Sequence, residues 1–108
     1  MTSTLSEQEF RLRSDEALEA AQKSLLPLAD AEGFEIEVQN GVLELLFEEP
    51  REAKFVVSPN APVRQIWISA MARSYKMAWD PACEGFALNG ERLTALLERL
   101  AREFLQSA

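Results

Sequence analysis

The chain has no histidine and only one cysteine among its 108 residues. Without an imidazole there is no Ser-His-Asp or Cys-His catalytic machinery and no imidazole-ligated metal site. The lone Cys83 excludes an internal disulfide, and it excludes any zinc or iron-sulfur site held by several thiolates of one chain. Carboxylates are therefore the side chains left for metal binding and acid-base chemistry.

Long apolar runs are also missing from the sequence. No stretch approaches the roughly 20 apolar residues that a membrane-spanning helix needs. The start of the chain, Met1 to Leu5, has neither a basic, apolar signal pattern nor an Arg-rich presequence pattern. A length of 108 residues with 47% hydrophobic content suits one compact domain. We therefore expect a single soluble, cytoplasmic domain over residues 1–108, with no contact to a membrane.

Positive charge is scarce in the first half of the chain. Residues 1–49 hold twelve acidic side chains and three basic ones, a net charge of −9, whereas the remainder carries +2 and the whole chain −7. Such a two-sided charge distribution favours orientation against a charged protein partner. The overall negative field argues against a nucleic-acid partner.

Two amphipathic helices are expected near the ends of the chain. Ser6 and Glu9 form a capping-box pattern, and an apolar stripe at helical spacing begins at Phe10. Pro27 is expected to end or kink this helix near Leu26. Asn89-Gly90 is expected to cap a closing helix with a second apolar stripe: Leu93, Leu96, Leu97, Leu100, Ala101 and Phe104.

Between the helices, alternating segments predict antiparallel strands. Residues 34–38 and 42–47 flank the turn signal Asn40-Gly41, and further strands are expected at 54–57, from Arg64, over 75–79 and near Phe86. Pro59 and Pro62 are expected to interrupt the chain before Arg64. The predicted fold class is α+β: a two-layer α/β sandwich in which an antiparallel five- or six-stranded sheet carries the N- and C-terminal helices on one face.

The run Gln65-Ile66-Trp67-Ile68-Ser69 carries the main functional signal. In a strand Ile66 and Ile68 enter the core, so Trp67 lies among polar neighbours on the opposite face. An exposed tryptophan suits the anchoring of another macromolecule, because it offers a large contact area at low entropic cost. The alternative interpretation is that a loop or a helix covers the ring.

Several motifs, together with the element order, make the chain resemble the frataxin family, in its bacterial form. Gly41-Val42-Leu43 is similar to the family's entry to its second strand. Pro62 with the run from Gln65 to Ser69 is similar to its Pro-x-x-Gln-Ile-Trp-Leu-Ser motif. Tyr75, eight residues after the tryptophan, and Gly90 with Leu93, Leu96 and Leu97 also match the family's pattern. The resemblance covers nearly the whole chain.

The resemblance implies weak iron binding by surface carboxylates. The candidate metal ligands are Glu16, Glu19, Asp30, Glu32 and Glu35, and oxygen ligands suit loosely held Fe²⁺ or Fe³⁺. The acidic ridge of the family is thinned here, since Lys23 and Pro27 occupy part of it. An ordinary solvated acidic face remains the alternative interpretation.

The resemblance also implies a regulatory, non-enzymatic role in iron-sulfur cluster assembly. A monomer would dock on a cysteine desulfurase and its scaffold protein through the acidic strip and through a sheet face. The residues of that face are Asn60, Arg64, Gln65, Trp67, Ser69 and Arg73, with Lys76 nearby. One alternative is a protein-interaction module that acts on the desulfurase without iron. Another is a carboxylate-based ferroxidase, against which stands the lack of the Glu-x-x-His pattern of di-iron sites.

Overall fold

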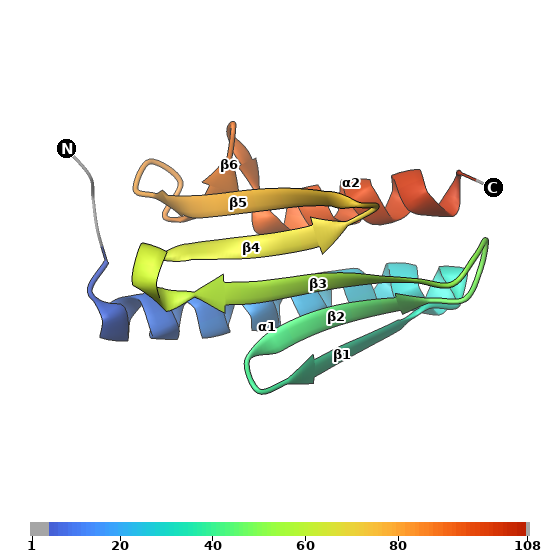
Figure 1. Ribbon diagram of the computed structural model, residues 1–108, viewed down its shortest axis with the longest axis horizontal. Helices are drawn as coiled ribbons and strands as arrows, with labels where there is room; N and C mark the ends of the chain where they lie inside the picture. The colour runs from blue at the N-terminus through green and yellow to red at the C-terminus, as the bar shows by residue number, and fades with distance from the viewer. Residues whose placement is uncertain (1–4, 108) are drawn as a thin grey trace.

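The computed structural model describes residues 5–107 (Figure 1). The segment Met1–Thr4, which belongs to the N-terminal stretch judged not to be a presequence, lies outside the described residues. No helix among residues 5–107 is long and apolar enough to cross a membrane. The elements are α1 (Glu7–Glu32), β1 (Glu35–Gln39), β2 (Val42–Phe47), β3 (Ala53–Asn60), a short 3₁₀ helix η1 (Ala61–Val63), β4 (Gln65–Ala70), β5 (Arg73–Asp80), β6 (Gly85–Leu88), β7 (Glu91–Arg92) and α2 (Leu93–Leu105).

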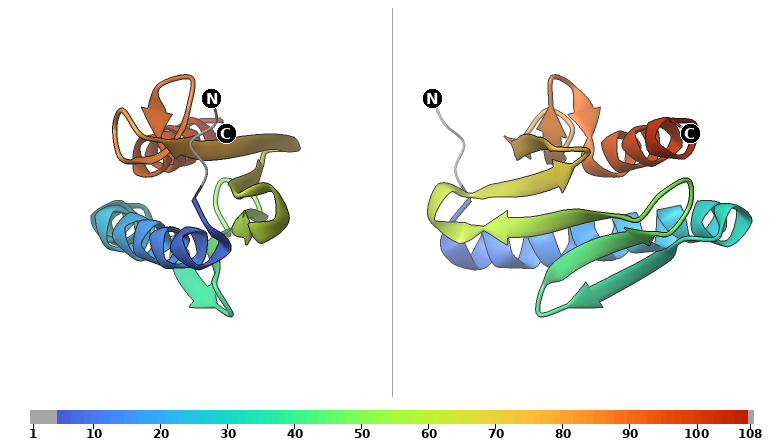
Figure 2. Two further views of the ribbon diagram at one scale, coloured as in Figure 1. Left: turned by 90° about the vertical axis from the view of Figure 1, so that its left-hand side faces the viewer. Right: turned by 45° about the vertical axis from the view of Figure 1, so that its right-hand side comes forward.

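The strands form one antiparallel meander in the order β1-β2-β3-β4-β5-β6-β7. Both helices pack on the same face of this sheet, so the molecule has two layers and the other sheet face is open (Figure 2). The predicted α+β sandwich is thus confirmed. The expected count of five or six strands was too low, because β7 has only two residues and leads directly into α2, which leaves no alternating pattern to recognise.

The core lies between the helices and the inner sheet face. All six apolar residues of the α2 stripe are buried, as are Phe10, Leu18 and Leu25 on α1. Phe47 of β2 joins the layers, since its ring centre lies 4.6 Å from that of Phe104 on α2 and 4.6 Å from that of Phe34. The capping box of Ser6 and Glu9 is present, with both hydrogen bonds at 3.1 Å.

Of the two outcomes expected for Pro27, an end of the first helix near Leu26 was wrong. Pro27 lies inside α1, which continues to Glu32 and ends at Gly33, in the left-handed region at φ 80°. Leu25 and Ala29, on either side of Pro27, are both buried in the core. Their packing outweighs the hydrogen bond that proline cannot donate, while Pro27 itself faces solvent.

Two turn predictions are corrected as well. β3 continues through Pro59 to Asn60, because beyond Val57 it has no partner in β2, and proline is tolerated where a strand lies at an edge. Arg64 precedes β4 in the left-handed region, so this strand begins at Gln65. Asn89-Gly90 forms the turn of the β6–β7 hairpin, whose closing pair is Leu88 and Glu91, and so does not cap α2.

Candidate docking face and carboxylate strip

Trp67 lies on the open face of the sheet, at the centre of β4. Its neighbours Ile66 and Ile68 are buried, whereas the tryptophan is 36% exposed. The alternation expected from the sequence is therefore present, and no described loop or helix covers the ring. Because β4 is the middle strand of the described meander, the indole stands on a rigid support with strands on both sides.

Two polar side chains hold the indole in place. The Trp67 Nε1 donates a hydrogen bond to Gln65 Oε1 at 2.8 Å. On the neighbouring strand, Lys76 is the direct cross-strand partner of Trp67 and places its Nζ 4.8 Å from the ring centre, a cation–π contact. On the other side the partner is Ser58 of β3. The ring is thus oriented before any partner arrives.

Four of the six predicted docking residues share this face. Asn60 pairs with Gln65 across β3 and β4, and residues at alternate positions of β4 lie on the same face. Ser69 lies two residues beyond the tryptophan and pairs with Val56 and Ser74. Together these side chains make a continuous surface: Asn60, Gln65, Trp67 and Ser69.

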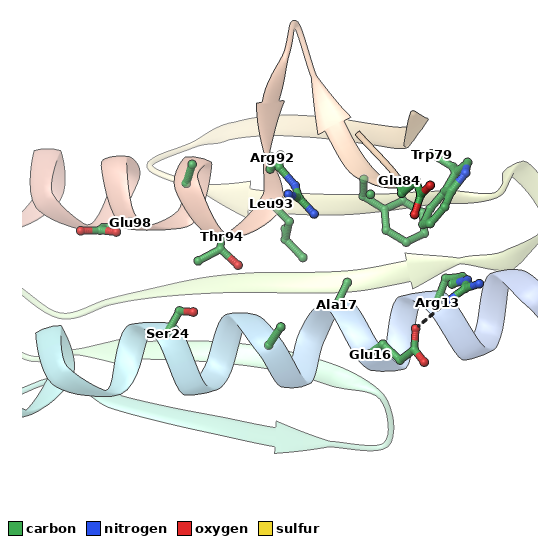
Figure 3. Close-up of a pocket in the computed structure, with 14 residues that line it drawn as sticks. Arg13, Glu16, Ala17, Ser24, Trp79, Glu84, Arg92, Leu93, Thr94 and Glu98 are labelled. Carbon is green, nitrogen blue, oxygen red and sulfur yellow. Dashed lines mark hydrogen bonds and ion pairs between the residues drawn. The ribbon is translucent and has the colours of Figure 1, made fainter. Parts of the chain in front are cut away.

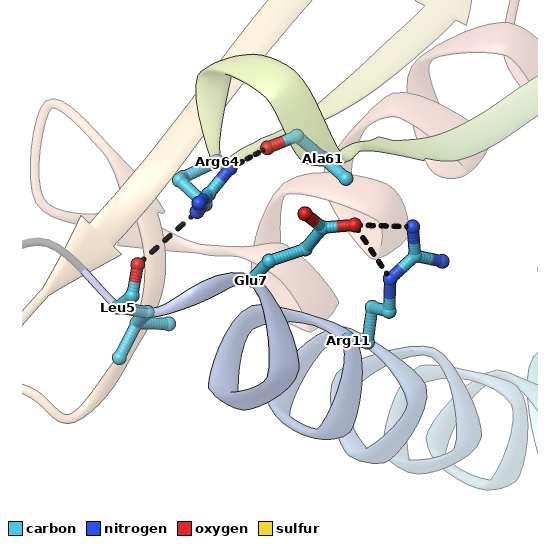
Figure 4. Close-up of polar contacts among 5 residues, drawn as sticks. All are labelled: Leu5, Glu7, Arg11, Ala61 and Arg64. Atoms are coloured by element: carbon cyan, nitrogen blue, oxygen red, sulfur yellow. Dashed lines mark hydrogen bonds and ion pairs between the residues drawn. The ribbon is translucent and has the colours of Figure 1, made fainter.

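The two predicted arginines lie elsewhere. Arg64 Nε donates to the Leu5 carbonyl at 3.1 Å and Nη1 donates to the Ala61 carbonyl, so its guanidinium ties η1 to the start of α1 (Figure 4). Arg73 pairs with Ala70, which is buried on the helix side of the sheet. Of the three basic residues expected near this face, Lys76 is the one that lies beside the indole.

Sequence reasoning missed Ser58 and Val56 as members of this face. A strand's own alternation tells which of its residues share a face, but it does not tell which residue of the next strand lies opposite. That register depends on the intervening turn. Here Pro59 and the segment of η1 gave no sequence signal for the true end of β3.

The predicted metal ligands on α1 are spread along the helix. Glu16 and Glu19 are exposed one turn apart, and Glu16 is paired with Arg13 at 3.1 Å. Asp30 lies about 16 Å beyond Glu19 at 1.5 Å per residue, and Glu32 points roughly 200° away from Asp30 around the axis at 100° per residue. Lys23 lies between Glu19 and Asp30 along the same exposed stripe.

The fifth predicted ligand, Glu35, belongs to the other layer. It pairs with Leu46 and through it with the exposed Lys54, so its carboxylate lies on the open sheet face. Among residues 5–107 no group of three or more Asp, Glu, Cys or His side chains is placed to hold a metal ion. The five carboxylates thus lie along α1 and on the open face of β1, and they do not converge on one point.

A groove of about 600 Å³ opens on the helix face between α1, α2 and β6 (Figure 3). Arg13 lies at one end, with its guanidinium 5.8 Å from the Trp79 ring centre and bonded to Glu16. Arg92 and Glu98 line the α2 side. Acidic and basic groups are mixed here, and Glu98 is already paired with Arg102 at 2.8 Å.

Comparison with known proteins agrees with this architecture. Residues 3–107 match a family model described as a frataxin-like domain. The chain belongs to the frataxin family.

Relatives in bacteria extend the similarity. The iron-sulfur cluster assembly protein CyaY of Cupriavidus metallidurans is 32% identical over 78 residues, covering 70% of this chain and 68% of the relative. The protein of the same name from Cupriavidus necator is 29% identical over 101 residues, covering 92% and 89%. A solved frataxin from Psychromonas ingrahamii superimposes with a TM-score of 0.71 over 95% of this chain and 92% of that one, at 18% identity, which shows the shared fold.

Proposed function

We propose that this protein is a non-enzymatic accessory factor of iron-sulfur cluster assembly that docks on a cysteine desulfurase and its scaffold protein. The observation that carries the proposal is the indole of Trp67, exposed and held by Gln65 and Lys76 on an open sheet face, in a chain of the frataxin family. The two Cupriavidus relatives are named as iron-sulfur cluster assembly proteins. Cytoplasmic location stays part of this proposal.

Docking would use the tryptophan as the anchor. A fixed aromatic ring surrounded by Ser58, Asn60 and Ser69 resembles an interface hot spot within a polar rim. The acidic strip along α1 and β1 would face a basic region of the desulfurase, and this charge complementarity would orient the complex and speed its formation. Lys76 would favour an acidic group on the scaffold side.

Weak iron binding by Glu16, Glu19, Asp30, Glu32 and Glu35 is the second part of the proposal. Carboxylates that are exposed to water and not clustered would bind Fe²⁺ or Fe³⁺ singly or in pairs, with water molecules as the remaining oxygen ligands. The absence of a three-ligand cluster among residues 5–107 favours the other candidate, a docking module that modulates the desulfurase without iron.

The docking test compares wild type with Trp67→Ala for binding to the desulfurase–scaffold complex, with and without a chelator. We expect Trp67→Ala to weaken binding by about 1–3 kcal/mol, while the control Gln106→Ala, at an exposed position at the end of α2 and outside both the tryptophan face and the acidic strip, leaves affinity unchanged. Unchanged affinity of a folded Trp67→Ala variant would contradict the docking proposal. Binding that survives chelation would favour the iron-independent candidate.

An iron titration followed by amide NMR tests the metal part separately. We expect ferrous iron to shift or broaden signals around Glu16 and Glu19 first, since these two carboxylates lie one helical turn apart. Glu16→Gln with Glu19→Gln should remove that response. If no signal near the five carboxylates moves, iron binding is rejected and the docking proposal stands on its own.

A further inference from the structure

β1 forms one margin of the sheet, and among the described residues its only ladder partner is β2 (Figure 1). Along an antiparallel edge strand, alternate residues direct their backbone N–H and C=O groups away from the sheet. The turn Asn40-Gly41, with both φ angles positive at 53° and 75°, closes on the pair Gln39 and Val42. In such a two-residue hairpin the closing pair faces inward, so the outward groups belong to Ile36 and Val38.

This edge has only part of the usual protection against pairing with another chain. Exposed edge strands are commonly blunted by charged side chains, above all lysine, by proline, by a bulge or by their shortness. β1 is short and carries Glu35 and Glu37, so its charge repels acidic segments but not basic ones. Residues 35–39 contain neither proline nor lysine, and five consecutive pairs with β2 leave no bulge. The strand is therefore a continuous template for one more antiparallel or parallel strand.

The side chains of β1 define what the added strand must look like. Glu35 and Glu37 lie on the open face. Glu44, the cross-strand partner of Glu37, adds a third carboxylate to this face. Ile36 and Val38 point to the helix side, where Ile36 is half-buried and Val38 is 42% exposed. The alternation of the sequence predicts that Val38 enters the core, but the margin of the sheet leaves it uncovered.

We propose that β1 binds, by strand addition, an extended segment of another protein in which basic and apolar residues alternate. Basic side chains of the segment would lie opposite Glu35 and Glu37, and its apolar side chains would cover Val38 and Ile36. A second copy of this chain does not fit, because pairing of two β1 strands brings glutamates of like charge together. Trp67 lies three strands away on β4. Glu35 belongs to the acidic strip of the proposed docking function, so this inference rests on that part of the proposed function and deepens it.

The test uses a short synthetic peptide of alternating lysine and valine, with the full chain. Binding should slow hydrogen exchange of the Ile36 and Val38 amides, because both would donate to the added strand. The control peptide has the same sequence with methyl groups on alternate backbone nitrogens, which removes its donors and should abolish binding. Glu35→Lys with Glu37→Lys should weaken binding about tenfold at low salt, whereas Trp67→Ala should leave it unchanged.

Three results would overturn the inference. The first is peptide binding without slower exchange at Ile36 and Val38, and the second is equal binding of the methylated peptide. The third is unchanged affinity of the charge-reversed variant, whose two substitutions lie at exposed positions and whose fold is checked by circular dichroism. Loss of desulfurase binding in Trp67→Ala with intact peptide binding separates this site from the tryptophan face.

Discussion

The Trp67 side chain donates its indole hydrogen to the Gln65 side-chain oxygen at 2.8 Å, between two residues that lie two positions apart on one strand face. Such a bond costs conformational entropy, because both side chains lose rotamer freedom when they form it. Here the contact orients a large ring whose other side meets Lys76. The result is a partly preorganised anchor, which lowers the entropy cost of docking.

Removing the acceptor should loosen this anchor. Gln65→Leu leaves the fold unchanged but frees the indole, and we expect it to weaken partner binding by roughly 1 kcal/mol, less than Trp67→Ala. Fluorescence anisotropy of Trp67, measured in a Trp79→Phe background, should fall in the same variant. Gln65→Glu, which keeps the acceptor oxygen, is the control and should retain the anisotropy. Equal anisotropy in Gln65→Leu and wild type would show that the hydrogen bond does not hold the ring.

Pro27 should limit the stability of α1. It lies in the interior of a 26-residue helix and on its exposed side. Proline in a helix interior costs about 3 kcal/mol relative to alanine, partly offset by the smaller entropy of the unfolded chain. We expect Pro27→Ala to raise the free energy of unfolding by about 1–3 kcal/mol in urea titrations. Ala31→Ser, at another exposed position of α1, should change it by less than about 0.5 kcal/mol. A less stable Pro27→Ala variant would contradict this interpretation of α1.

The β4–β5 turn stores backbone strain. Met71 and Ala72 have φ angles of 52° and 62°, in the left-handed region that disfavours residues with a Cβ. Ala72→Gly should therefore raise the free energy of unfolding by about 1 kcal/mol. The matched control is Gly41→Ala in the β1–β2 turn, where φ is 75° and nothing lies within 4 Å of an added Cβ. The Gly41→Ala variant should lose a similar amount of unfolding free energy. A change of the same sign in both variants would refute the argument.

The Glu91–Arg99 pair should make stability depend on acid pH. Arg99 donates two hydrogen bonds of 2.8 Å to the Glu91 carboxylate, and this pairing lowers the Glu91 pKa below its ordinary 4.5. A carboxyl whose pKa is lowered in the folded state stabilises the fold at pH values above its unfolded-state pKa. This stabilisation is lost as the pH falls through the folded-state pKa.

We therefore expect Glu91→Gln to lower the free energy of unfolding by about 0.5–1 kcal/mol near neutral pH and to match wild type in strong acid. Urea titrations at several pH values measure the difference. Glu48→Gln is the control, since Glu48 makes no ion pair among residues 5–107. A difference between Glu91→Gln and wild type that persists unchanged in acid would contradict the assignment.

Local patterns predicted the elements whose signals lie within one segment. The apolar stripe of α2, the capping box at Ser6 and the strand 42–47 are all confirmed. The errors arose where a local signal competed with packing. Pro27 lies between two core residues, which keep α1 helical, and Asn89-Gly90 closes a short hairpin, whose two-residue second strand leaves no alternation to recognise.

The sequence by itself determined the two-layer sandwich, the sheet face on which Trp67 lies and the restriction of metal binding to carboxylates, because periodicity and composition are properties of the chain alone. Only the tertiary structure decided that the Trp67 ring is uncovered, that Ser58 lies beside it, that Arg64 and Arg73 lie elsewhere, and that the carboxylates spread over two layers. Register between strands and the placement of a helix over a sheet depend on turns and core packing between distant residues. No pattern within a single segment contains that information.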